Sequence, residues 1–195
     1  MTTTSAALPA NTPGKLIRWH YLWYAAAALA VMVAVIVSRN VWLLNFLHVF
    51  TGLLWTGIDL FMGFILGPIL RMVDISARRA VLLRLTPRTL FLMPALAAIT
   101  GTTGWYMAEY LGFTTLAWPD YGWVAAALAL VTLMTILGLG YLLPANLRVC
   151  LELQKDNPDH AKIAALTNHY FLAVALQGAM QVVTILVMAR FATGI

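Results

Sequence analysis

Apolar residues occur along this chain in long runs separated by short polar connections, and the longest run covers residues 41–70. About 20 apolar residues are enough for a helix to cross a bilayer, so each run predicts one membrane span. The pattern therefore predicts an all-α fold, a polytopic bundle of five transmembrane helices. The expected spans cover residues 21–37, 41–70, 87–108, 122–147 and 164–190.

Proline and cap residues mark where several of these spans begin or bend. Thr86 and Pro87 predict the N-cap and first helical residue of the third span. Asn157 and Pro158 predict the start of the fifth in the same way. Pro144 predicts a kink near the end of the fourth span, because proline cannot donate the helical hydrogen bond.

Outside the spans, two segments of the chain allow a structural prediction: the N-terminal tail and the basic connection between the second and third spans. Residues 1–20 are rich in Thr, Ala and Pro and lack an apolar period, so we expect a disordered cytoplasmic tail. Residues 21–195 then form a single transmembrane domain. The connection at residues 74–88, with the sequence DISARRAVLLRLTPR, predicts a short basic helix lying on the anionic inner leaflet.

Lys and Arg are distributed unevenly among the connections, and this asymmetry predicts orientation. They are most frequent before the first span, between the second and third, and between the fourth and fifth. By the positive-inside rule, the N-terminus is cytoplasmic and the C-terminus lies on the periplasmic or extracellular side.

Composition supports a membrane protein and excludes other classes. Hydrophobic residues make up 62% of the chain and charged residues 10%. The formal net charge of +5 would suggest nucleic-acid binding in a soluble chain, but here the basic residues flank the spans, so the predicted partner is the lipid bilayer. The one cysteine, Cys150, excludes an internal disulfide and any CxxC site.

One face of the second span carries polar chemistry. Asn45, His48, Gly52, Trp55 and Asp59 follow one another at steps of three or four residues, so they share a helix face. Ionisable groups at membrane depth turn toward protein, cofactor or water rather than lipid. This face is therefore predicted to point into the bundle.

Helix rise, about 1.5 Å per residue, predicts which polar groups share a depth. His48 falls roughly 12 Å below the outer boundary, at about the depth of Thr103 in the third span. In the fifth span Gln181 falls near His48, and Gln177 falls nearer Asp59.

Two interpretations of this region remain open: a polar network that fixes helix packing, and a cofactor site with His48 as axial ligand to haem or as a metal ligand. The cofactor interpretation assigns binding to His48, Gly52, Trp55, Thr103 and Gln181. The polar-network interpretation assigns packing to Asn45, Asp59 and Gln177. Asp59 is the acidic residue deepest in a span, and it suits either a proton relay or a protonated hydrogen-bonding role.

The other histidines lie nearer the inner boundary. His169 is the second candidate metal ligand, but helix rise places it in the opposite leaflet from His48, so the two do not clamp one iron. His20 lies level with His169 and makes a geometric pair with it, although its surroundings, RWHYLWY, are typical of an interfacial aromatic belt. His160, in a polar loop, is interpreted as solvated.

Three segments carry a resemblance to a known group. The first, FLHVFTGLLWTGIDLFMGFILGPIL, contains an H-x₃-G-x-x-W-x-G arrangement at His48, Gly52, Trp55 and Gly57. The others are LFLMPALAAITGTTGWYMA and LTNHYFLAVALQGAMQVVTILVMARF. In pattern and order they resemble the small bacterial membrane proteins that include the copper-resistance D domain, the membrane-type protoporphyrinogen oxidase and the N-terminal membrane domain of cytochrome-linked urate oxidase.

The resemblance implies a four-helix core over spans two to five, an added first span, residence in the bacterial cytoplasmic (inner) membrane and, for some members, haem b (heme b) held through His48. The oxidase-type members carry a lysine in their third core helix, and GWVAAALALVTLMTILGLG has none. This departure argues against protoporphyrinogen oxidation.

Three functional hypotheses follow. The first is a haem b protein that transfers electrons between a quinone or a membrane or periplasmic cytochrome and another redox protein; if enzymatic, it would be a haem-dependent membrane oxidoreductase. The second is a transporter of copper or a small solute that uses Asp59 and the glutamines. The third is a structural or assembly subunit of a respiratory complex, or an oligomer, in which the polar face only packs helices.

Overall fold

The computed structural model of the protein describes residues 19–193, which are almost entirely helical and contain no strand. The predicted tail lies outside the described residues except for Trp19 and His20, and His20 opens the first helix rather than ending the tail. The elements are α1 (His20–Ser38), α2 (Val41–Leu60), the π-helix η1 (Phe61–Leu66), α3 (Gly67–Met72), α4 (Ile75–Tyr110), the 3₁₀ turn η2 (Phe113–Thr115), α5 (Tyr121–Leu137), the π-helix η3 (Gly138–Leu142), α6 (Leu143–Leu153) and α7 (His160–Thr193).

These elements form long rods because α2, η1 and α3 continue one another, as do α5, η3 and α6. Among the described residues, five helices are long and apolar enough to cross a membrane: His20–Ser38, Val41–Met72, Ile75–Tyr110, Tyr121–Leu153 and His160–Phe191. The prediction of an all-α polytopic bundle is confirmed.

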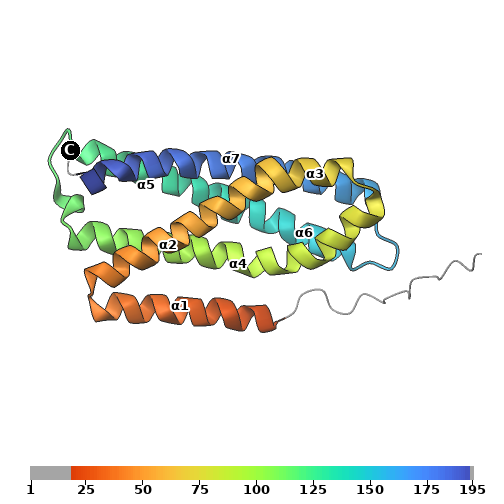
Figure 1. The fold of residues 1–195 in the computed structure, drawn as a ribbon, viewed down its shortest axis with the longest axis horizontal. Coiled ribbons are helices and arrows are strands. Elements are labelled where there is room, and N and C mark those ends of the chain that lie inside the picture. Colours follow the sequence, from red (N-terminus) through yellow and green to blue (C-terminus); the bar gives the residue numbers. More distant parts are fainter. Residues whose placement is uncertain (1–18, 194–195) are drawn as a thin grey trace, which may run out of the picture.

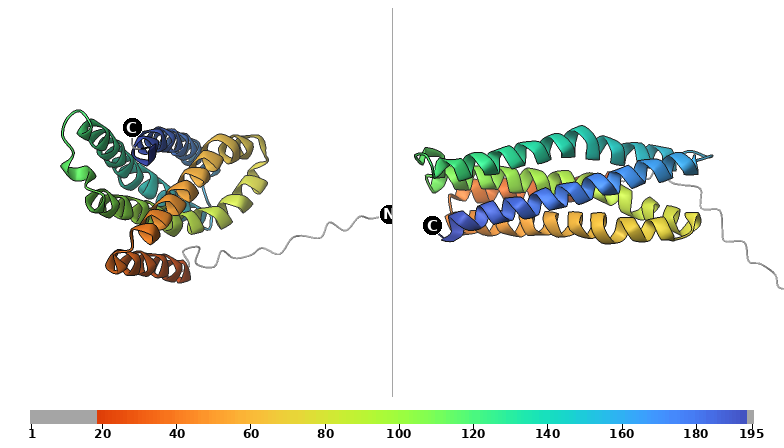
Figure 2. Two further views of the ribbon diagram at one scale, coloured as in Figure 1. Left: turned by 60° about the vertical axis from the view of Figure 1, so that its left-hand side comes forward. Right: turned by 90° about the horizontal axis from the view of Figure 1, so that it is seen from above.

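The rods lie roughly along one long axis (Figure 1). α2 crosses diagonally between α4 and α7, while α5 and α6 lie beside α7, as the two further views in Figure 2 also show. α1 packs on the outside of α4 and has no buried residue. One end of the bundle holds the α1–α2 turn and η2, and the other holds the α3–α4 turn and the α6–α7 loop.

Two glycines bring the backbone of α7 against the second rod, which consists of α2, η1 and α3. A Cβ added at Gly63 would lie 2.5 Å from the Cα of Ala175, and one added at Gly178 would lie 3.0 Å from the Leu60 side chain. Small residues allow this close approach, which drives helix association where lipid supplies no hydrophobic force. The contact fixes α7 against the junction of α2 and η1.

α4 corrects the predicted start of the third span. It is one helix of 36 residues with Pro87 and Pro94 inside it. Thr86 is 4% exposed and lies within the helix, so it is not a cap. The basic stretch is the first part of this helix rather than a separate surface helix. Leu82, 2% exposed, belongs to the core cluster, and this packing outweighs the cost of the proline.

The two π-helices have a common sequence context. η1 ends at Leu66 and η3 at Leu142, and in each case a proline follows two residues later, at Pro68 and Pro144. Because proline has no N–H to donate, the preceding turn loses a helical bond, and a wider turn with one extra residue accommodates the change. The kink expected at Pro144 thus takes the form of a π segment, and the fourth span continues to Leu153.

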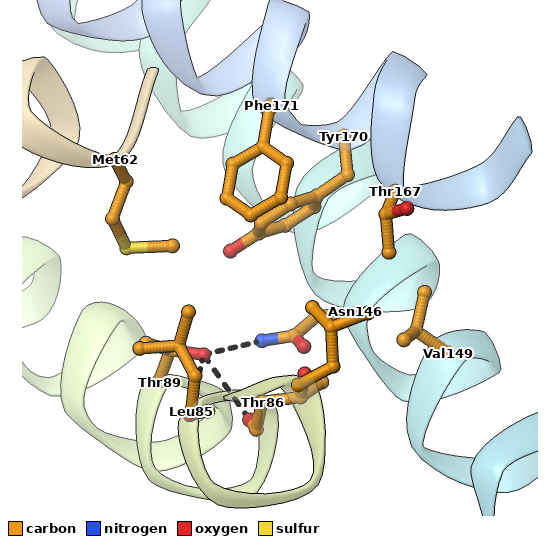
Figure 3. A pocket seen from close by; sticks show the side chains of 10 residues that line it. Met62, Leu85, Thr86, Thr89, Asn146, Val149, Thr167, Tyr170 and Phe171 are labelled. Atoms are coloured by element: carbon orange, nitrogen blue, oxygen red, sulfur yellow. Dashed lines mark hydrogen bonds between the residues drawn. The ribbon is translucent and has the colours of Figure 1, made fainter. Parts of the chain in front are cut away.

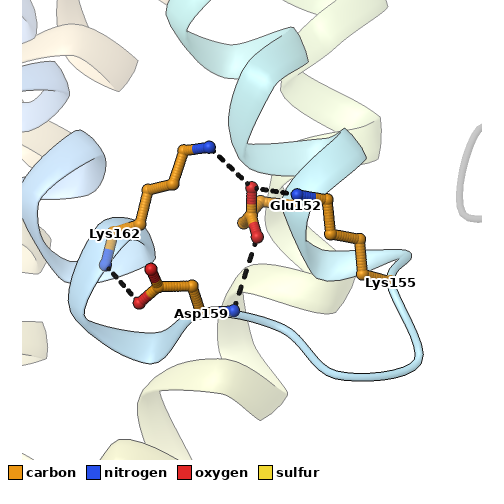
Figure 4. Close-up of polar contacts among 4 residues, drawn as sticks. All are labelled: Glu152, Lys155, Asp159 and Lys162. Atoms are coloured by element: carbon orange, nitrogen blue, oxygen red, sulfur yellow. Dashed lines mark hydrogen bonds and ion pairs between the residues drawn. The ribbon is translucent and has the colours of Figure 1, made fainter.

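An ionic cluster closes the α6–α7 loop (Figure 4). Glu152 is 4% exposed, and its Oε2 accepts from Lys155 Nζ at 2.9 Å and from Lys162 Nζ at 3.1 Å. The backbone N–H of Asp159 donates to Glu152 Oε1 at 3.4 Å, and the Asp159 carboxylate caps α7 at the Lys162 N–H. The loop is therefore tied to both helices that it joins.

The Gly63 contact yields a stability prediction with a matched control. Gly63→Ala places a methyl group against the Ala175 backbone, so overpacking is expected to destabilise the fold by about 1–3 kcal/mol. Gly57→Ala, with nothing within 4 Å of the added Cβ, should leave stability unchanged or slightly raised. Thermal unfolding in detergent measures both. Equal melting temperatures for the two variants would contradict the predicted contact.

Candidate functional site

Asp59 is the most deeply buried acidic residue of the described chain. It is 1% exposed and lies near the end of α2, two residues before η1 begins at Phe61. Its Oδ2 accepts a hydrogen bond from Gln181 Nε2 at 3.0 Å and a longer one from Gln177 Nε2 at 3.4 Å. A carboxyl of the second rod is thus joined to two amides, one helical turn apart on α7.

The cluster leaves several buried polar atoms without partners. Trp55 Nε1, Gln177 Oε1 and Gln181 Oε1 are buried and have no hydrogen-bond partner. Within residues 19–193, the ion pairs join Glu152 to two lysines and Asp120 to Arg190, and none involves Asp59. The carboxyl is therefore surrounded by dipoles but by no compensating positive charge.

A small cavity with partly polar and partly apolar walls lies close to this cluster (Figure 3). It has a volume of about 10 Å³, enough for about one water molecule. Met62, three residues after Asp59, lines one side, and the Tyr170 hydroxyl points into the space. Asn146 Nδ2 donates to Thr89 Oγ1 at 3.1 Å across another wall. The polar lining comes from Thr86, Thr89, Asn146, Thr167 and Tyr170.

One wall of the cavity is hydrogen-bonded to the first turns of α4, near the α3–α4 turn. Thr167, one of its lining residues, also accepts a hydrogen bond from the Arg78 guanidinium. The same Nη2 donates to Asn168 Oδ1 at 3.0 Å and to the Ala164 carbonyl at 3.2 Å. The cavity wall is therefore joined to Arg78 through Thr167.

His48 lies apart from this series, on the contact between α2 and α4. Its Nδ1 is 2.9 Å from the Thr100 carbonyl oxygen and 3.4 Å from Thr103 Oγ1. A carbonyl only accepts, so Nδ1 carries the proton and Nε2 is the bare nitrogen of the neutral ring. Gly104 makes room for the ring, since a Cβ there would lie 2.7 Å from His48 Cε1. The predicted proximity of His48 to Thr103 agrees with this geometry.

The fit of His48 to haem is mixed. A histidine whose Nδ1 is held by a carbonyl presents Nε2 as a ligand, the arrangement that orients metal-binding imidazoles. The ring, however, is packed on Gly104, and His48 lines neither of the two cavities of about 10 Å³ described for this bundle. The residues present therefore supply one ligand atom and no porphyrin-sized space inside the bundle.

Other residues assigned to a cofactor or metal site fall in separate places. Gln181 bonds Asp59 and not His48, and Trp55 is buried. The half-buried Gly52 lies beside Thr100, whose methyl would be 3.3 Å from an added Cβ, and Asn45 is exposed.

His169 does not approach His48. It is exposed and donates from Nδ1 to the Ala165 carbonyl of its own helix at 2.9 Å. Phe171 contacts Gly67, which puts His169 roughly 28 Å along the bundle from His48 by helix rise. Nowhere in the described residues do three His, Cys, Asp or Glu side chains gather as metal ligands.

Sequence reasoning missed the polar lining around Thr89, Asn146 and Tyr170. Thr86 and Thr89 share a helix face with Leu82, at spacings of three and four, so the α-helical period was a usable signal. The N-cap interpretation of Thr86 concealed it by starting the helix there.

Comparison of this chain with protein-family models, curated proteins and solved structures finds no significant match.

The close contact between His48 and Gly104 predicts that substitutions of these two residues have coupled effects on stability. Gly104→Ala should displace the imidazole, cost the Nδ1 hydrogen bond and destabilise the protein by about 1 kcal/mol. Gly101→Ala, with nothing within 4 Å of its Cβ, is the control. In a His48→Ala background the Gly104→Ala effect should vanish, and a double-mutant cycle by thermal unfolding tests this. Additive effects would show that the ring and the glycine do not interact.

Proposed function

We propose that this multi-pass membrane protein carries protons, with Asp59 as the proton-binding group. The observation that supports this is the burial of the Asp59 carboxyl, 1% exposed, against two amide donors and no positive charge. An ionised carboxylate in such a place is costly, and groups of this kind in membrane spans mark proton or ion pathways. Gain of a proton removes the charge.

The surrounding amides suit both forms of the carboxyl. In the ionised form, Gln177 and Gln181 donate N–H groups to Oδ2. In the protonated form, the carboxyl gains an O–H donor, and the buried cluster contains two unpaired acceptors, Gln177 Oε1 and Gln181 Oε1. A site that serves both states lowers the cost of switching between them.

A water molecule in the neighbouring cavity is the group through which protons would pass between Asp59 and the α3–α4 end of the bundle. In that cavity the water would lie among hydroxyl and amide groups, and the Thr167 hydroxyl connects the cavity wall to Arg78. Chains of such groups relay protons by successive hydrogen bonds. With the orientation predicted from the basic residues, this end is cytoplasmic.

Substitution of Asp59 separates proton carriage from helix packing. Asp59→Asn keeps the size and one carbonyl acceptor but cannot titrate. In proteoliposomes with an internal pH dye and an imposed potential, the wild type should show proton flux, and Asp59→Asn should fall to the rate of protein-free liposomes. Asp120→Asn, 66% exposed at its side chain, should retain the flux.

Infrared difference spectra between acid and alkaline pH give an independent readout. We expect a carboxyl signal that Asp59→Asn removes. A folded Asp59→Asn variant with unchanged flux and spectrum would favour the packing role instead.

We also propose haem b binding through His48, as a second candidate. The supporting observation is the free Nε2 of a ring whose Nδ1 is bonded to the Thr100 carbonyl. Because the interior is packed at this ring, the group would have to approach Nε2 from outside the α2–α4 contact. When bound, haem would supply one-electron redox chemistry; this chain would contribute an axial nitrogen and its orientation.

An absorption spectrum tests this second candidate. Protein from haem-replete cells should show a Soret band that His48→Ala removes. His169→Ala should leave the band in place, since His169 is exposed near the start of α7 and lies far along the bundle from His48. A colourless wild-type preparation that still passes protons would reject haem and leave the Asp59 proposal intact.

A further inference from the structure

A second group of unpaired donors lies where α4 and α7 begin. Arg78 Nε and Arg79 Nε are buried and lack hydrogen-bond partners. Both residues line a cavity of about 10 Å³ together with His160 and with apolar walls from Ile75, Leu82 and Ile163. Buried donors in folded proteins are almost always paired, so this pocket lacks an acceptor.

No acidic side chain of the described region supplies that acceptor. The acid nearest in the chain to α4, Asp74, precedes it without capping it, and no ion pair within residues 19–193 includes Arg78 or Arg79. Glu152 is occupied by Lys155 and Lys162. The pocket is therefore positive. Its volume is that of about one water molecule, so an anion from outside the chain would meet the two half-buried arginines at its rim.

The arginines are already held in place. Arg78 Nη2 donates to Ala164 O, Asn168 Oδ1 and Thr167 Oγ1 of α7, which leaves its Nε side for another partner. Arg79 adds a second guanidinium from the next position. Two planar, permanently charged guanidinium groups can donate several hydrogen bonds to the oxygens of one phosphate group.

The apolar surroundings favour a lipid as the source of the phosphate. Ile75, which lines the pocket, is 56% exposed, and Met72, three residues before it in the chain, is 79% exposed. Acyl chains would cover these residues while the headgroup reaches the arginines. Basic pockets between membrane helices near the bilayer surface bind anionic headgroups in this way.

We propose that Arg78 and Arg79, with His160, form a binding site for the phosphate headgroup of an anionic phospholipid between α4 and α7. The site shares Arg78 with the wall of the Thr167 cavity, but binding of the phosphate does not require a proton at Asp59. It ties the first turns of α4 to α7 through a lipid, in addition to the direct Arg78 bonds.

Native mass spectrometry of the full chain, titrated with phosphatidylglycerol or phosphatidylcholine in detergent, tests the site. Wild type should prefer phosphatidylglycerol, and Arg79→Gln should weaken that binding about tenfold through loss of a charge-assisted bond. Arg84→Gln is the matched control, because Arg84 is exposed and donates to Ala80 of its own helix. Arg79→Lys, which keeps the charge but not the guanidinium group, should fall between wild type and Arg79→Gln.

Three results would overturn the proposal. Unchanged phosphatidylglycerol affinity in folded Arg79→Gln would show that the pocket is not the site, and an equal loss in Arg84→Gln would indicate diffuse surface charge. Thermal stabilisation of the wild type by inorganic phosphate to the same extent as by phosphatidylglycerol would assign the pocket to a soluble phosphate. Should Arg79→Gln fail to fold, the Arg79→Lys and Arg84→Gln affinities decide, because an equal loss in both excludes the pocket.

Discussion

The contact of α7 with the junction of α2 and η1 is the constraint on which the polar interior depends. Gly63 and Gly178 add no side chain of their own to the contact between α7 and the α2–η1 junction, and this closeness lets Gln177 and Gln181 reach Asp59. Inside a bilayer there is no water to replace a lost partner, so separation of the rods would leave the carboxyl and both amides unpaired. The burial of the Asp59 carboxyl therefore depends on the glycine packing between α7 and the α2–η1 junction.

Helix rise and amphipathic spacing predict the spans and the meeting of His48 with Thr103, because depth depends only on residue number. They do not predict that Gln181 bonds Asp59 rather than lies near His48. That choice depends on how α7 is rotated and shifted against α2, which the contacts at Gly63 and Gly178 fix. The residues of the polar face could be listed from sequence, whereas their pairing required the packed bundle.

The start of the third span shows a local signal overruled by packing. A Thr-Pro pair has the same appearance at a helix start and inside a helix, and only the burial of Thr86 and Leu82 separates the two cases. Once the first turns of α4 pack on α7, the arginines there face a pocket instead of lying flat on lipid headgroups. Recognition of that pocket needed the partner helix, which is about 90 residues away in the chain.

The unpaired buried atoms are confined to two places, and this separates sites from scaffold. Around His48 the hydroxyls are satisfied: Thr51 donates to the Leu47 carbonyl and Thr103 to that of Ile99. The orphaned side-chain atoms of the described chain belong to Trp55, Gln177, Gln181, Arg78 and Arg79. The first three lie around the carboxyl to which we assign proton binding, and the last two belong to the pocket to which we assign an anion. Folded proteins rarely leave such groups unpaired, and this is why both proposals start from these atoms.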